Sequence, residues 1–235
     1  MKRSNLVSVF NVLAIFASHS AFSALPEFSS LPSKTNLPDP LVMLDGQRVS
    51  SPAQWNNQRR PELKELFAHY MYGAIPPKPA KMTTEVVGEY HDFLDGKATL
   101  KLVRMQAGPG EGPHIDLMLV VPKERRAPAP VFLTMDFCGN HAITTDPRVP
   151  LAQSWLGRNC AGCTNGVAAE AARGSQAANW PLGELVRRGY ALAAFYSGDI
   201  DSDRKEASTG IYAWLAAGDP SKNKPEDRGT IAAWA

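Results

Sequence analysis

The chain has 235 residues and a formal net charge of +2, and 44% of its residues are hydrophobic while 20% are charged. These values are ordinary for a globular protein of one large or two small domains. The near-neutral charge gives no electrostatic reason to expect binding to nucleic acid or to an anionic membrane.

The first 23 residues have the pattern of a secretory signal peptide. Lys2 and Arg3 precede an apolar run over 6–16, and small residues follow at Ala21 and Ser23. We expect cleavage after Ser23 and a secreted or periplasmic protein that no membrane segment retains. The alternative is an uncleaved anchor, but the apolar run is short for a bilayer span.

Residues 24–60 are rich in Pro, Ser and Asn, which predicts an extended segment that wraps a surface. Residues 61–235 are predicted to form the main domain. It opens with a helix that starts at Pro61 and ends at Gly73. The apolar residues of this helix repeat on one face: Leu63, Leu66, Phe67 and Tyr70.

Strand patterns follow the helix. Residues 85–90 and 99–105 alternate between apolar and polar side chains, as half-buried antiparallel strands do, and 115–121 is a third strand. Asp95 and Gly96 lie between the first two strands and predict the tip of a hairpin.

Two continuous apolar runs, 131–135 and 191–196, are typical of central strands covered on both faces. Between them lie a long insertion loop, 142–180, and a helix with Pro181 near its start and Gly189 just past its end. The order of elements predicts an α/β sheet with an antiparallel beginning.

A polar loop directly follows the strand at 131–135. In open α/β sheets the functional crevice lies at the carboxyl ends of the strands, so this loop is a candidate site. Gly139 allows a close backbone approach to a ligand. The candidates for stabilising an oxyanion through the backbone N–H groups of this loop are Cys138, Gly139, Asn140 and His141. The alternative is a plain turn between a strand and a helix.

Five blocks in chain order resemble the glucuronoyl esterases, carbohydrate esterase family fifteen. They are LPDPL, WNNQRRPELKELFAHYMYGAIP, DFCGNHA, ARGSQAANWPLGELVRRGYALAAFYSGDIDSD and YAWLAAGDPSKNKPEDRGTIAAWA. The resemblance implies an α/β-hydrolase-type three-layer sandwich, present here as the amino-terminal half of the sheet. It also implies hydrolysis of 4-O-methyl-glucuronate esters of glucuronoxylan, or an acetyl xylan esterase-like activity, by a full-length monomer that needs no cofactor.

The resemblance also predicts what these residues lack. Family members use a Ser-His-acid triad with the Ser on a nucleophile elbow, and the chain contains no G-x-S-x-G. We therefore expect the catalytic residues to lie beyond Ala235 and the chain to have no esterase activity. We also expect the strand at 191–196 to remain as an exposed edge. The alternative is a non-catalytic carbohydrate-binding protein.

Three further residues are candidates for lining the substrate pocket. Arg173 and Trp180 close the insertion loop, where an Arg suits a carboxylate and a Trp face suits a sugar ring. Trp180 could instead pack against the helix start at Pro181. Asp199 belongs to the acidic run 198–203, which lacks the spacing of a calcium-binding EF-hand and is expected to be a solvated loop.

The three cysteines leave several possibilities open. A disulfide between Cys160 and Cys163 is the expected pairing in an exported protein. The alternatives are three free thiols, or a zinc site in which Cys138 and His141 join the other two cysteines. We expect no metal.

Overall fold

The computed structural model describes residues 25–108, 112–204, 210–218 and 229–235, and the predicted signal peptide lies outside them. The chain forms two compact units, residues 1–40 and 41–235. In the first unit the regular element is a 3-10 helix, η1 (Phe28–Ser30). None of the helices within the described ranges has the length and apolar character that crossing a membrane requires.

A run of helical turns lies near the start of the second unit, after an isolated bridge between Val42 and Arg48. It comprises α1 (Pro52–Gln54), the π-helix η2 (Trp55–Arg59), α2 (Arg60–Phe67) and the π-helix η3 (Ala68–Tyr72). Gly73 ends the run with a positive φ of 77°, as predicted.

The expectation of extended chain through residue 60 is wrong from residue 52 onward. Ser51 caps the first helical turn by accepting a hydrogen bond from the N–H of Gln54 at 3.1 Å, and Pro52 occupies the first helical position. Both are start signals for a helix, so helical structure begins nine residues before Pro61.

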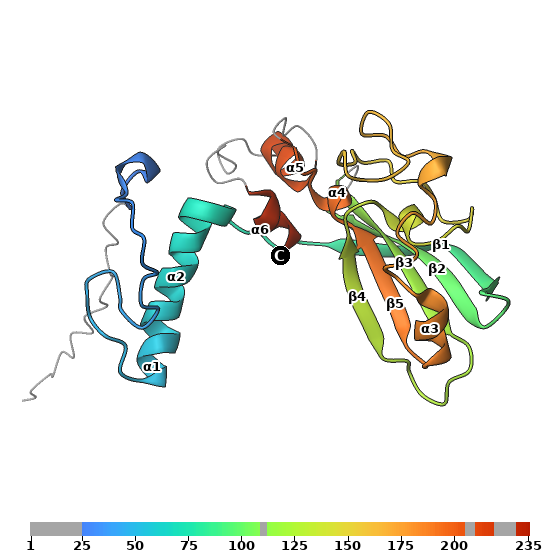
Figure 1. Cartoon of the computed structure of the whole chain (residues 1–235), viewed down its shortest axis with the longest axis horizontal. Coiled ribbons are helices and arrows are strands. Elements are labelled where there is room, and N and C mark those ends of the chain that lie inside the picture. The colour runs from blue at the N-terminus through green and yellow to red at the C-terminus, as the bar shows by residue number, and fades with distance from the viewer. Residues whose placement is uncertain (1–24, 109–111, 205–209, 219–228) are drawn as a thin grey trace, which may run out of the picture. The chain divides into compact units, whose positions relative to one another are not determined.

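The main domain contains a five-stranded sheet in the order β1-β2-β3-β5-β4 (Figure 1). Its strands are β1 (Met82–Phe93), β2 (Ala98–Ala107), β3 (His114–Pro122), β4 (Val131–Asp136) and β5 (Ala191–Tyr196). The first three strands pair antiparallel, β5 pairs antiparallel with β3, and β4 pairs parallel with β5. All five predicted strands and the antiparallel beginning are confirmed.

The hairpin between β1 and β2 turns where the sequence predicted. Leu94, Asp95 and Gly96 have positive φ angles of 52°, 57° and 77°. Asp and Gly tolerate this left-handed conformation better than most residues, which is why this pair marks the tip.

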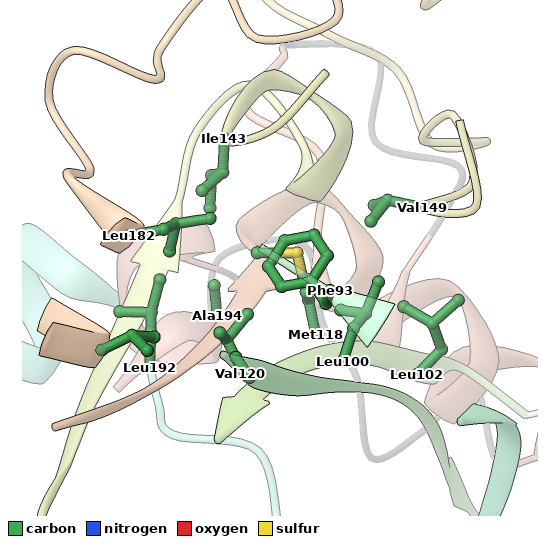
Figure 2. Packing of buried hydrophobic residues seen from close by; sticks show 12 residues of the cluster. Phe93, Leu100, Leu102, Met118, Val120, Ile143, Val149, Leu182, Leu192 and Ala194 are labelled. Carbon is green, nitrogen blue, oxygen red and sulfur yellow. The ribbon is translucent and has the colours of Figure 1, made fainter. Parts of the chain in front are cut away.

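The core lies at the centre of the sheet, where β2, β3 and β5 contribute fully buried side chains (Figure 2). Leu100, Met118 and Leu192 are each at most 1% exposed. Ile143 from the insertion loop and Leu182 from α3 (Leu182–Arg187) also belong to this cluster. The insertion loop is therefore held to the sheet by its own apolar side chains.

The prediction of the exposed edge is wrong. β5 lies between β3 and β4 and its side chains are almost all buried, whereas β4 forms the edge. Val131, Phe132 and Leu133 of β4 are 54%, 51% and 70% exposed. The prediction assumed that the strands follow one another in the sheet as they do in the chain. In the structure β5 lies between β3 and β4, which leaves β4 at the edge.

Helices follow β5, namely α4 (Ser197–Ile200), α5 (Ile211–Gly218) and α6 (Thr230–Trp234). The start of the acidic run expected to be a loop is therefore helical. Asp201 anchors α6, because its carboxylate accepts from the hydroxyl of Thr230 at 2.8 Å and its carbonyl accepts from the indole of Trp234 at 3.1 Å.

Candidate functional site

A cavity of about 570 Å³ lies at the carboxyl end of β5, beside β2 and β3. Its volume falls in the range that holds small ligands in proteins. Polar and aromatic groups from distant parts of the chain face it: Asp116, Asn140, Ser154, Trp155, Asp199 and Trp214. This position agrees with the expectation that the crevice lies at the carboxyl ends of the strands.

Asp199, in α4, is a partly buried carboxylate that lines this cavity. One oxygen accepts from the N–H of Asp116 at 3.3 Å and the other accepts from the hydroxyl of Ser154 at 3.1 Å. Burial raises the pKa of Asp199 to about 6, and these two hydrogen bonds oppose the rise. Asp199 therefore gains or loses its proton in mildly acidic solution.

Asp116 lies across the β2–β3 pair from Arg104. The guanidinium binds both carboxylate oxygens, at 2.8 and 3.0 Å, and these two residues are register partners. This bidentate pair fixes the rim of the cavity beside Asp199.

The loop after β4 folds around the carboxylate of Asp136. Asp136 is 5% exposed and accepts from the N–H of Cys138 at 2.7 Å. Burial raises the pKa of Asp136, while the N–H groups of Cys138, Gly139 and Phe137 and the indole of Trp180 lower it. The N–H group of Cys138, a candidate for stabilising an oxyanion, thus already binds a side chain of the protein.

Asn140 connects this loop to the cavity. Its Nδ2 donates to the carbonyl of Asp116 at 2.6 Å, and it lines the cavity. Its Oδ1 is buried and has no hydrogen-bond partner among the described residues. Asn140 therefore retains an unused acceptor at the wall of the cavity.

His141 is fully buried behind this loop. Its Nδ1 accepts from the N–H of Ala152 at 3.3 Å, so the neutral ring carries its proton on Nε2, which has no partner among the described residues. Burial lowers the pKa of His141 and the charge of Arg173 lowers it further, so the ring stays neutral. A Cβ at Gly139 would lie 2.8 Å from the His141 ring, and Gly139 has a φ of 88°, so glycine is required there.

A disulfide joins Cys138 to Cys160, with the two Cα atoms 5.4 Å apart. The expected Cys160–Cys163 pairing is therefore wrong, and Cys163 is a free thiol. The prediction relied on the short distance in sequence between Cys160 and Cys163. In the folded chain Cys160 instead packs beside Cys138, in a cluster with Leu156 and Tyr196.

The alternative of a zinc site at these cysteines also fails. It needed the thiolates of Cys138 and Cys160, and the disulfide consumes both. In the described ranges, no three His, Cys, Asp or Glu side chains are grouped as metal ligands.

Comparison with known proteins gives a consistent result. The chain is 40% identical over 200 residues to carbohydrate esterase MZ0003 of an unknown prokaryotic organism, which covers 84% of this chain and 46% of that protein. It is also 34% identical over 80 residues to a 4-O-methyl-glucuronoyl methylesterase of Podospora anserina. This match covers 32% of this chain and 16% of that protein. No protein-family model matches.

Solved structures agree. A promiscuous CE15 esterase from the marine bacterial metagenome superposes with a TM-score of 0.69 and 38% identity, over 88% of this chain and 51% of that one. A glucuronoyl esterase from Solibacter usitatus superposes with a TM-score of 0.72 and 32% identity, over 88% and 52%. This chain is related to the carbohydrate esterases of family fifteen.

The chain spans about half the length of these family-fifteen relatives, consistent with an amino-terminal part. The fold is accordingly an α/β-hydrolase-type sandwich, and the described residues form a mixed sheet of five strands.

The structure separates the predicted site residues into two groups. Asn140 and Asp199 line the cavity, whereas Cys138, Gly139 and His141 support the loop behind it.

Arg173 and Trp180 do not line the cavity either. The guanidinium of Arg173 donates to the carbonyls of Val149 at 2.6 Å and Asp146 at 3.3 Å and pairs with Glu170. Trp180 packs against the core cluster, in line with its alternative role. Both side chains hold the insertion loop in place.

Sequence reasoning missed Asp116, Ser154, Trp155 and Trp214 as cavity residues. A partial signal existed for Asp116, because an acidic residue interrupts an apolar strand opposite an arginine. Ser154 and Trp155 reach the cavity through the path of the insertion loop, for which the sequence carries no periodic signal.

Proposed function

We propose that this chain is part of a carboxylic ester hydrolase that acts on 4-O-methyl-glucuronate esters of glucuronoxylan, including esters to lignin alcohols. The observation that carries the proposal is the 40% identity to a carbohydrate esterase over 84% of the chain. The name of the Podospora anserina relative supports the glucuronate ester as substrate. Acetyl esters are the alternative, and the description of one structural relative as promiscuous supports them.

In this proposal the reaction is acyl transfer to a serine, followed by hydrolysis. The 235 residues hold no G-x-S-x-G, so the proposed triad corresponds to the part of the relatives that these residues do not cover. The exposed apolar edge of β4 supports this, because a parallel strand of an α/β sheet is normally covered. The chain alone is therefore proposed to be inactive.

The described residues would contribute the wall of the pocket and polar groups near the ester carbonyl. Since the N–H group of Cys138 binds Asp136, the proposed role beside the oxyanion passes to Asn140, which lines the cavity and whose Nδ2 carries a second hydrogen besides the one it donates to Asp116. Asp199 would bind hydroxyl groups of the sugar, as a carboxylate or as an acid according to pH.

Export of the protein is part of the proposal. An insoluble wall polymer lies outside the cell, and the disulfide between Cys138 and Cys160 supports a secreted or periplasmic location, because such bonds persist in oxidising compartments.

The proposal is tested by a chimera that joins residues 25–235 to the part of carbohydrate esterase MZ0003 that follows its aligned region. We expect the chimera to hydrolyse a 4-O-methyl-glucuronate methyl ester and residues 25–235 alone to release no methanol. Replacing Asn140 with Ala in the chimera should lower kcat by about 10²-fold, the effect of removing one oxyanion-side group.

Asn179→Ala is the matched control, because Asn179 is exposed and lies outside the cavity. A chimera that unfolds cooperatively but leaves the ester intact would overturn the proposed function.

A second candidate is carbohydrate binding without catalysis. Two indole side chains, Trp155 and Trp214, line a cavity that also holds a carboxylate and an amide, and sugars bind to such surfaces through stacking and hydrogen bonds. Calorimetric titration of residues 25–235 with a glucuronoxylan oligosaccharide decides this. Heat that saturates, and that Trp155→Ala removes, supports binding.

A further inference from the structure

All three cysteines lie in one side-chain cluster. Cys138 and Cys160 are buried and bonded to each other, and the free thiol of Cys163 packs against the same cluster. The bond ties the loop after β4 to the insertion loop, across a sequence separation of 22 residues.

A tight turn holds Cys163 near Cys160. The N–H of Cys163 donates to the carbonyl of Cys160 at 3.3 Å, which closes a turn of four residues. In such a turn the first and fourth Cα atoms lie less than about 7 Å apart, and a disulfide spans Cα separations of about 4.4–6.8 Å.

Gly162 makes this turn possible. It has a φ of 75°, and a Cβ there would come within 2.5 Å of the backbone of Ala171 and Ala172. The turn is therefore fixed by packing as well as by its hydrogen bond, and Cys160 has a second cysteine within geometric reach.

We infer that Cys160 has two alternative disulfide partners, and that Cys163 exchanges with the Cys138–Cys160 bond to give a second form of the protein. The thiolate of Cys163 attacks Sγ of Cys160, the bond to Cys138 breaks, and the Cys160–Cys163 bond forms. Cys138 leaves as a thiolate and takes up the proton that Cys163 gave to solvent. The number of disulfides is unchanged, so no oxidant or reductant is needed.

The structure shows the form with the Cys138–Cys160 bond. The exchange releases the loop after β4 from the insertion loop and leaves a thiol at Cys138, two residues before Asn140.

Alkaline solution accelerates the exchange. Burial raises the pKa of the Cys163 thiol, and the attacking species is the thiolate, so its rate rises about tenfold per pH unit below that pKa. Tyr196 faces Cys163, and burial raises its pKa as well, so its hydroxyl stays neutral over the same range.

Peptide mapping tests the exchange. The chain is held without reductant at about pH 7 or about pH 9, labelled with N-ethylmaleimide in mild acid and digested with trypsin. Cleavage at arginines gives one peptide, 127–148, with Cys138, and another, 159–173, with both other cysteines. The described form yields the two peptides cross-linked, with the label on Cys163. We expect the pH 9 sample to lose part of this pair and to show the label on Cys138, with an internal disulfide in 159–173.

Cys163→Ser is the control, because it removes the attacking thiol and leaves the Cys138–Cys160 bond. Label on Cys138 in this variant would show that another reaction opens the bond, and would overturn the inference. The inference is also overturned if Cys138 of the natural chain stays unlabelled after a day at pH 9 although it reacts once the protein is reduced.

Discussion

The two edges of the sheet differ in chemistry. β1 presents exposed charged and polar side chains such as Glu85 and Glu89 between its exposed apolar ones, Met82, Val86 and Val87, and its register shifts between Val86 and Gly88. The exposed residues of β4 are the apolar 131–133. Charged side chains and bulges are the usual protection of a strand that faces water, and β1 has both.

The difference indicates that the two edge strands are suited to different surroundings. β1 is built to be a boundary, whereas β4 has the composition of a strand with neighbours on both sides. A relative of twice the length contains additional chain that could supply such a neighbour, which is the arrangement proposed above.

The largest expected effect contrasts the centre of the sheet with the β4 edge. Met118 in β3 is 0% exposed, and Met118→Ala should lower the free energy of unfolding by about 2–5 kcal/mol, since it removes buried methylenes and leaves a cavity. Leu133→Ala at the edge should change it by less than about 0.5 kcal/mol. Urea titration of both variants measures this, and equal losses would contradict an exposed β4.

A smaller effect is expected at the cavity beside β3. The folded pKa of Asp199 is about 6, above the unfolded value of about 3.9, so the folded state binds more protons between these values and stability falls as pH rises through them. Asp199→Asn should remove this loss and stabilise the chain by about 1–2 kcal/mol at pH 7 relative to pH 4. Melting curves of both proteins at the two pH values test this prediction. If the stabilities of the two proteins change equally between the two pH values, the result would contradict a raised pKa for Asp199.

Lysine substitutions at the two edges should have the smallest effect on stability. They should have a measurable effect on association between chains. Leu133→Lys should reduce concentration-dependent association of residues 25–235 several-fold, because a charge on an edge strand opposes pairing with other chains. Val86→Lys on β1 is the matched control, since Val86 is also about half exposed, at 53%. Light scattering measures both, and an equal reduction by the two variants would mean that the edges do not differ.

Local patterns in the sequence predicted the local structure well. The alternation in 85–90 and 99–105, the Asp95–Gly96 turn and the apolar run at 191–196 each depend on neighbouring residues, and each is confirmed. The start of the first helix was missed although Ser51 and Pro52 are signals of the same local kind.

Features that depend on distant residues were predicted poorly. The sheet order places β5 between two strands that precede it in the chain, and no periodicity reports such an insertion. Cys160 pairs with Cys138, 22 residues away, rather than with Cys163 in the same turn as predicted. Within the candidate site, Asn140 and Asp199 were found because they follow strands, whereas Arg173 was misplaced because its side chain turns toward loop carbonyls.

Hydrogen exchange of the β4 amides tests the central claim most directly. In residues 25–235, the amides of 131–136 that do not donate to β5 should exchange freely, and in the chimera with the following part of carbohydrate esterase MZ0003 they should become protected. The outer amides of β1 should exchange at the same rate in both proteins. If the β4 amides exchange at the same rate in both proteins, the result would contradict the proposal that β4 pairs with a further strand in the longer protein.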